Sequence, residues 1–188
     1  MTHSKCIRIL VLALLPLVNA VAHELQGNRA TLVLRDATHV AMTLYLGYPE
    51  LLHLTLAPQQ DFSEFVLLYS GLPPDTFKTA LLKAHAALQS QITVNNADGR
   101  PARLEHWVWP DASQAQEAMR LRAMRSLVAP NSHSHESPLE VRCEVQTSKP
   151  IGALSVVFAP EFQRVLVVSY QPKQVWAETG GKATEIKF

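Results

Sequence analysis

Three histidines are placed where they could bind a transition metal together. His133 and His135 lie in a polar stretch, residues 131–137, that contains no apolar residue. In an extended segment, side chains two residues apart point to the same side, about 7 Å apart. His23 directly follows Ala22, the end of a small-x-small sequence, and cleavage there would give its imidazole a neighbouring free α-amine. These nitrogens suit Cu(II), so the pattern predicts a copper site formed by His23 with His133 or His135.

The nitrogen set at His23 resembles the histidine brace of N-terminal-histidine copper proteins, such as lytic polysaccharide monooxygenases and periplasmic copper-resistance carriers. An N-terminal amine has a pKa of about 7.7–8.0, so a metal can displace its proton near neutral pH. The resemblance covers His23 alone and implies copper binding, for transport or for redox chemistry, but no common fold. The alternative is that His133 and His135 are solvated loop residues. His39 and His53 are further candidates for the second ligand.

The first 22 residues have the three parts of a secretory signal peptide. Lys5 and Arg8 precede an apolar run, residues 9–18, and a small-x-small cleavage sequence follows. The run is too short to span a bilayer, which takes about 20 apolar residues. We therefore expect residues 1–22 to be removed and residues 23–188 to form one domain in the periplasm, with no membrane span after cleavage.

Cysteine usage supports the same compartment. Cleavage would remove Cys6 and leave Cys143 alone, so no intramolecular disulfide could form. A secreted domain without disulfides fits a bacterial periplasm better than a eukaryotic exterior. Apolar and polar residues alternate over residues 139–146, which predicts a strand with the Cys143 thiol on its buried face. We expect this thiol to be inert.

Two tryptophans form a second candidate site. Trp107 and Trp109 lie in a predicted strand, residues 103–109, that returns from a hairpin turn at residues 95–99. The turn contains Asp-Gly, which readily takes the backbone angles of hairpin loops. Plain alternation places both indoles on one face with Glu105. Such a pair can form a platform on which a sugar or a peptide stacks. The alternative is that the two side chains pack beneath helices.

Composition and missing motifs argue against several functions. The chain of 188 residues has 17 Lys and Arg against 16 Asp and Glu, which does not favour a nucleic-acid partner held by bulk charge. The sequence has no Gly-x-Ser-x-Gly, glycine-rich phosphate loop, His-Glu-x-x-His or Cys-x-x-Cys motif. We therefore expect a binding or interaction protein, with an unidentified protein, small-molecule or metal partner, and not an enzyme. A copper carrier is the alternative, and a redox enzyme using the same copper site is a third hypothesis.

The order of the predicted elements indicates an α+β fold. Strand-like segments lie at both ends of the predicted domain, and helix-like segments are grouped between them. The expected architecture is a mainly antiparallel sheet built from hairpins, with two or three helices packed on one face. Residues 152–158 and 164–171 are apolar on both faces, which is typical of central strands that are covered on two sides.

Overall fold

The computed structural model describes residues 27–128 and 137–172, and this part of the chain has the predicted α+β fold. The elements in chain order are β1 (Asn28–Leu34), β2 (His39–Leu46), α1 (Tyr48–Leu56), α2 (Phe62–Ser70), α3 (Pro74–Gln91), β3 (Thr93–Asn96), β4 (Arg103–Val108), α4 (Ala112–Val128), β5 (Leu139–Gln146), β6 (Leu154–Val157), the 3-10 helix η1 (Pro160–Phe162) and β7 (Val165–Tyr170). The predicted signal peptide, residues 1–22, lies outside the described residues.

The main sheet has five strands in the order β4-β5-β2-β1-β7. Every neighbouring pair is antiparallel except β1 with β7, which is parallel, so the sheet is mainly antiparallel as predicted. The β1–β2 hairpin closes through Asp36, whose Oδ1 accepts hydrogen bonds from the backbone N–H groups of Thr38 and His39 at 2.8 and 3.0 Å. Aspartate commonly stabilises turns by bonding to the backbone that follows it.

One face of the main sheet forms the core. Alternate side chains of β2 and β5 are buried on it, namely Val40, Met42, Leu44, Leu46, Val141, Cys143 and Val145. The predicted burial of Cys143 is therefore confirmed. Burial, together with the negative charge of Glu144, raises the pKa of this thiol to about 12. The thiol stays protonated at neutral pH and is a poor nucleophile.

The hairpin predicted around residues 95–99 is only partly formed. The turn closes, because the backbone N–H of Asn96 donates to the carbonyl oxygen of Arg100 at 2.9 Å. Beyond the turn, however, β3 pairs with β6 in a separate two-stranded sheet, whereas β4 pairs with β5. The hairpin ladder continues past Pro101, which is bridged to Asn95, and ends where the N–H of Ala102 donates to the carbonyl oxygen of Val94 at 2.8 Å. The chain therefore crosses from the small sheet to the main sheet at this point.

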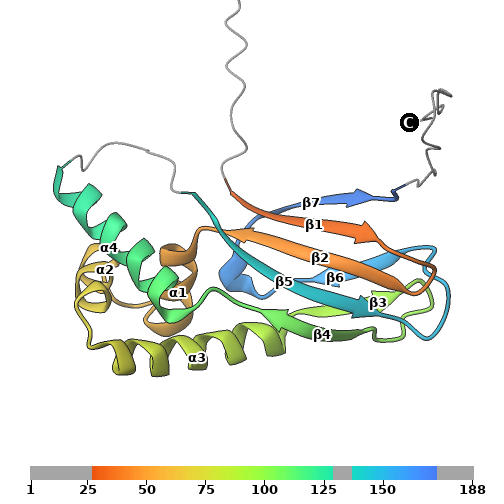
Figure 1. The fold of residues 1–188 in the computed structure, drawn as a ribbon, viewed down its shortest axis with the longest axis horizontal. Helices are drawn as coiled ribbons and strands as arrows, with labels where there is room; N and C mark the ends of the chain where they lie inside the picture. Colours follow the sequence, from red (N-terminus) through yellow and green to blue (C-terminus); the bar gives the residue numbers. More distant parts are fainter. Residues whose placement is uncertain (1–26, 129–136, 173–188) are drawn as a thin grey trace, which may run out of the picture.

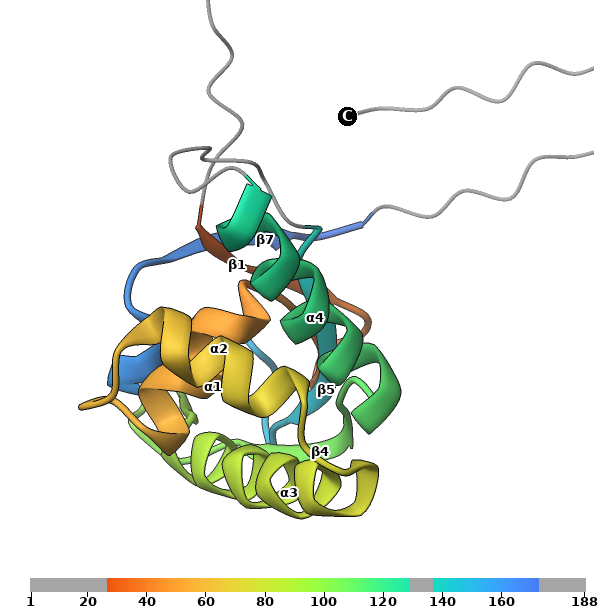
Figure 2. The same ribbon diagram turned by 90° about the vertical axis from the view of Figure 1, so that its left-hand side faces the viewer.

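Residues 27–128 and 137–172 contain four α-helices where two or three were expected, and they gather mainly at one end of the main sheet (Figures 1 and 2). Two of them begin at caps that the sequence contains. Asp61 accepts hydrogen bonds from the backbone N–H groups of Ser63 and Glu64 before α2. Asp111 and Gln114 bond each other's backbone N–H before α4. These caps satisfy N–H groups that a helix start leaves unpaired.

The positions of the last two strands differ from the prediction. Both were expected to be central, but β7 lies at the edge of the main sheet and β6 belongs to the two-stranded sheet. The side chains of Leu166, Val167 and Tyr170 in β7 are 39%, 48% and 56% exposed. In this protein, a strand with apolar residues on both faces is therefore not necessarily a central strand that is covered on two sides.

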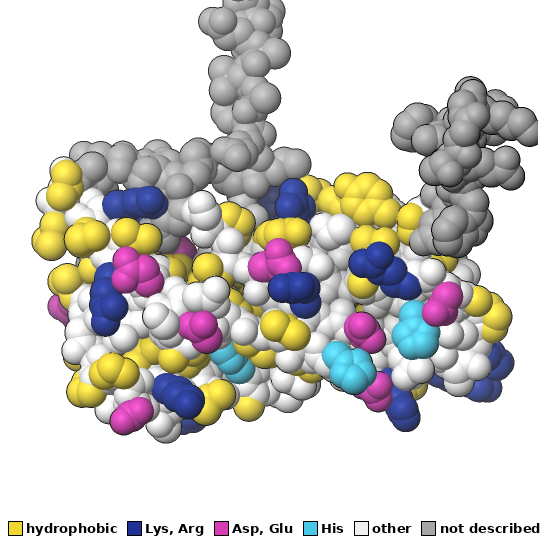
Figure 3. All heavy atoms as spheres, viewed as in Figure 1, with side chains coloured by type: hydrophobic (Ala, Val, Ile, Leu, Met, Phe, Trp, Pro, Cys, Tyr) yellow, Lys and Arg dark blue, Asp and Glu magenta, His cyan; other side chains and the backbone are white. Residues whose placement is uncertain are grey.

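The described surface carries mixed charge. Figure 3 shows Lys and Arg interspersed with Asp and Glu over the face in view, in keeping with the small net charge. Among the described helices, none has an apolar stretch of the length needed to cross a membrane.

Candidate ligand-binding site

A β-bulge in β4 decides which way the tryptophans face. β4 stays in register with β5 as far as Glu105, and pairing resumes one residue out of step at Val108. The backbone of His106 has a φ of 54°, in the left-handed region found at some bulges. Because His106 is the extra residue, Leu104 and Trp107 lie on the same face of the strand and pack against the core.

The predicted faces of β4 are therefore partly wrong. Glu105 does not share a face with Trp107 and Trp109: it lies on the outer face, where its carboxylate pairs with Arg103 at 3.3 Å. The two tryptophans face inward and are half-buried. Histidine adopts a positive φ more often than most residues other than glycine, but a single histidine in a strand-like sequence does not predict one. Plain alternation consequently fails at His106.

The two tryptophans belong to a row of contacting aromatic side chains that runs from the core towards the surface. The ring centroids of Trp107 and Trp109 are 5.6 Å apart, and their planes are inclined by 16°. Trp109 stacks in turn on the imidazole of His85 in α3. The Nε2 atom of His85 is hydrogen-bonded to the hydroxyl of Tyr48, the first residue of α1. We call these four residues the aromatic row.

Burial sets the protonation states within the aromatic row. It lowers the pKa of His85 to about 4, so the imidazole is neutral at physiological pH. It raises the pKa of the Tyr48 hydroxyl above its ordinary value, so the phenol keeps its proton. The phenol is the stronger donor, and we therefore assign the Tyr48 O–H as donor to Nε2 of His85, which leaves the ring proton on Nδ1. A base with so low a pKa is poorly matched to proton transfer near pH 7.

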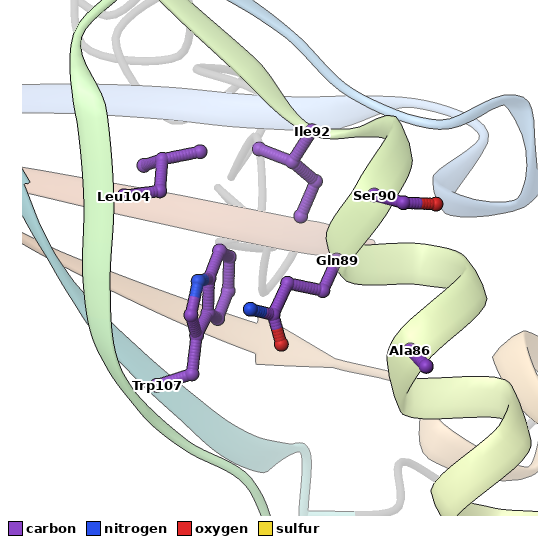
Figure 4. Close-up of a pocket in the computed structure, with 6 residues that line it drawn as sticks. All are labelled: Ala86, Gln89, Ser90, Ile92, Leu104 and Trp107. Carbon is purple, nitrogen blue, oxygen red and sulfur yellow. The ribbon is translucent and has the colours of Figure 1, made fainter.

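The outer end of the aromatic row borders a cavity of about 420 Å³ between the end of α3 and β4 (Figure 4). The residues that line it are Ala86, Gln89, Ser90, Ile92, Leu104 and Trp107. In Figure 4 the side chain of Gln89 extends from α3 towards the ring of Trp107. Gln89 and Ser90 are exposed, so the cavity opens to solvent on their side. Its volume falls within the range typical of small-molecule sites.

The indole nitrogens of both tryptophans are buried, and neither has a hydrogen-bond acceptor among the described residues. Leaving a buried donor unsatisfied costs roughly 1–3 kcal/mol. A phenylalanine at either position would avoid this cost and still fill apolar space. Apolar packing alone therefore does not explain why tryptophan, and not phenylalanine, stands at both positions.

The three histidines predicted to bind copper lie outside the described residues; they are His23, His133 and His135. The other candidates are engaged elsewhere. His39 contacts the carboxylate of Asp36 at 3.1 Å in the hairpin turn. Nε2 of His53 is hydrogen-bonded to the carbonyl oxygen of Gln60 at 2.8 Å. Within residues 27–128 and 137–172, no group of three His, Cys, Asp or Glu side chains could hold a metal ion.

Sequence reasoning identified Trp107 and Trp109 but missed the residues that α3 contributes. The helix carries an apolar stripe that includes Phe77, Leu81 and Leu88, and such a stripe indicates a core face and nothing more. His85 reaches Trp109 from a distant part of the sequence, so no local pattern could identify this contact.

No protein-family model, curated protein or solved structure matches this chain. The functional interpretation therefore depends on the geometry and chemistry of the site itself.

Proposed function

We propose that this protein binds a small neutral ligand, and specifically a saccharide, in the cavity beside Trp107. One observation carries the proposal: the indole of Trp107 is stacked against Trp109 and also lines an open cavity of about 420 Å³. An aromatic ring that is supported by a neighbour and also borders a cavity offers a surface on which a sugar ring can stack.

The cavity lining favours a neutral ligand with both apolar and polar surfaces. Ile92, Leu104 and the indole provide apolar walls, and none of the six lining residues is charged. A charged ligand would lose hydration without gaining an ion pair. On the solvent side, Gln89 and Ser90 offer amide and hydroxyl groups for hydrogen bonds. A sugar ring combines these surfaces, with C–H groups on its faces and hydroxyls around its rim.

The aromatic row supports binding because it holds Trp107 in place before a ligand arrives. Trp109 stacks between Trp107 and His85, and the His85 side chain is only 7% exposed. A side chain that is already ordered loses little conformational entropy on binding. The cost of binding at this surface is correspondingly low.

Titration with neutral mono- and oligosaccharides, monitored by tryptophan fluorescence, tests this proposal. We expect the emission of the wild-type protein to change on binding and the response to disappear in Trp107→Ala. Gln89→Ala should weaken binding, whereas Gln91→Ala should not, because Gln91 is an exposed residue at the same end of α3 that does not line the cavity. This matched pair remains informative if Trp107→Ala folds poorly.

The outcomes of these titrations distinguish a saccharide-binding site from a peptide-binding site. If saccharides give no response but neutral peptides give one that Gln89→Ala weakens, the site is a peptide site and the saccharide assignment is wrong. If neither class gives a response that depends on Gln89 or Trp107, the proposed function itself is wrong.

Copper binding by His23 with His133 or His135 is a second proposal, and the described strands that follow these segments support it. β1 begins at Asn28 and β5 at Leu139, and both lie beside the end of β2. Two strand spacings, about 10 Å, separate these starts. His23 precedes Asn28 by five residues and His135 precedes Leu139 by four. An extended chain covers about 3.3 Å per residue, so segments of these lengths are long enough to bridge that separation.

The copper proposal also depends on export and on cleavage after Ala22. Protein purified from the periplasm should begin at His23 and bind Cu(II), and His23→Ala should abolish that binding. His133→Ala combined with His135→Ala should weaken it, whereas His39→Ala should have no effect. A different first residue, or Cu(II) binding that His23→Ala leaves unchanged, would show that the copper assignment is wrong. A saccharide titration in the presence of a chelator distinguishes the two proposals, because saccharide binding at Trp107 should not depend on a metal.

A further inference from the structure

The two edges of the main sheet differ in how they are protected against pairing with another strand. β4, at one edge, carries the charged residues Arg103 and Glu105 and the bulge at His106. Pro101 and Pro110 lie on either side of it. Charges, bulges and prolines are the features by which natural sheets block the addition of a further strand.

β7, at the opposite edge, has such features only outside the strand, where Arg164 directly precedes it and Pro172 lies two residues beyond its end. Its sequence contains no charged residue, proline or glycine, and it pairs with β1 in unbroken register. In the part of the chain that the structure describes, β1 is its only neighbour, so one row of its backbone groups faces outward. Apolar side chains gather along this edge in Figure 3, and Leu166, Val167 and Tyr170 are exposed. An uncharged, regular edge of this kind favours the addition of another strand.

We propose that the added strand is β7 of a second copy of this chain, paired antiparallel around a two-fold axis through Val167. In antiparallel pairing, residues opposite each other share a face of the sheet. Val167 lies on the same face as buried Ala30, its neighbour in β1. Opposite Val167 of one copy is then Val167 of the other. Moving outward from the axis, the opposed pairs are Leu166 with Val168, Val165 with Ser169, and Arg164 with Tyr170.

This register makes β7 complementary to itself, which favours a second copy over an unrelated peptide. The exposed guanidinium of Arg164 falls opposite the 56% exposed ring of Tyr170, a pair that can form a cation–π contact. No two like charges oppose each other. The apolar side chain of Val167, 48% exposed in one copy, becomes covered by its own counterpart.

Sedimentation velocity of the full chain tests this proposal. We expect a reversible dimer whose dissociation constant rises roughly tenfold or more in Val167→Lys, because two ammonium groups then face each other across the axis. Val108→Lys is the matched control: Val108 is a 53% exposed valine on the edge strand β4, and its substitution should leave the dimer intact. A monomer at all concentrations, or a dimer that both variants affect equally, would overturn the proposal.

Disulfide cross-linking provides a test that does not depend on the stability of a charged variant. Opposed antiparallel residues have Cα atoms about 4.5–5.5 Å apart, within the range that a disulfide spans. In a Cys6→Ser background, Val167→Cys should form a covalent dimer on mild oxidation. Leu166→Cys should not form one, because Leu166 lies opposite Val168 of the other copy and the two Leu166 residues are only diagonal neighbours. Cross-linking through Leu166→Cys in preference to Val167→Cys would overturn the register. Protection from exchange, in a monomer, of the outward-facing β7 amides that are not bonded to β1 would overturn the proposal.

Discussion

The imidazole of His85 stacks on the indole of Trp109 with ring centroids 4.4 Å apart and planes inclined by 16°. This contact joins α3 to the segment that follows β4. Because Trp109 also stacks on Trp107, the position of the cavity wall depends on a histidine in the interior. Changes at His85 or Tyr48 should therefore affect both the stability of the fold and the shape of the cavity.

The stability of the protein should fall in mild acid because of His85. Its pKa is lowered from 6.5 to about 4 by burial in the folded state. Between these pH values the unfolded chain binds a proton that the folded protein does not, so the free energy of unfolding decreases as pH falls from about 6.5 to 4. We expect this group to contribute on the order of 3 kcal/mol to the change.

Urea denaturation at a series of pH values measures this contribution. His85→Gln cannot take up a proton, so its free energy of unfolding should depend less steeply on pH over the same interval. The carboxylates titrate in both proteins, and the comparison therefore isolates the imidazole. Equal slopes for the wild type and His85→Gln would contradict the assignment.

Tyr48→Phe should destabilise the protein by roughly 1–3 kcal/mol, because it leaves Nε2 of His85 buried without its partner. Chemical denaturation followed by circular dichroism provides the measurement. Tyr45→Phe is the control: Tyr45 is half-buried, and the guanidinium of Arg29 lies over its ring at 4.3 Å, a contact that does not need the hydroxyl. A loss of stability at Tyr45→Phe as large as that at Tyr48→Phe would mean that the hydrogen bond is not the cause.

At the bulge position His106, the stability of the protein should depend on whether the substituted residue is glycine or a β-branched residue. With φ at 54°, His106→Gly should be at least as stable as the wild type, because glycine adopts this angle without steric cost. His106→Val should lose about 1–2 kcal/mol. Thermal denaturation of the two variants tests this, and a result in which valine is tolerated as well as glycine would argue against a positive φ at this position.

The thiol of Cys143 should be unreactive in the folded protein. It is 3% exposed, and its pKa is raised to about 12, chiefly by burial, so the thiolate is scarce at pH 8. In a Cys6→Ser background, a thiol-specific reagent should label the protein only after denaturation. Val108→Cys in the same background should react at once and serves as the positive control. Rapid labelling of Cys143 without denaturant would place the thiol at the surface, contrary to the fold.

The sequence predicts those features of the fold that depend on neighbours in the chain. Alternation over residues 139–146 correctly predicts that Cys143 of β5 is buried. The Asp-Gly turn before Arg100 also forms. Each of these features depends on a period of two or on turn chemistry, both of which can be read in a short window.

Features that depend on distant pairing could not be predicted in this way. The apolar pattern of β7 describes its composition but not its place in the strand order, which is decided by its parallel pairing with β1. The inward face of Trp107 depends on one extra residue, His106, relative to β5. The contact of His85 with Trp109 needs α3 and β4 to be brought together by the whole fold. For the same reason, the sequence indicated a tryptophan platform but not the cavity that it lines.

The most direct test of the account is the indole N–H spectrum of the ¹⁵N-labelled protein during a saccharide titration. The chain has three tryptophans, and Trp107→Phe and Trp109→Phe identify the two signals of interest. Binding in the cavity predicts that the Trp107 signal shifts most, that Trp109 shifts less, and that Gln89→Ala reduces both shifts. A Trp107 signal that stays in place while the saccharide saturates the fluorescence response would contradict the proposed site.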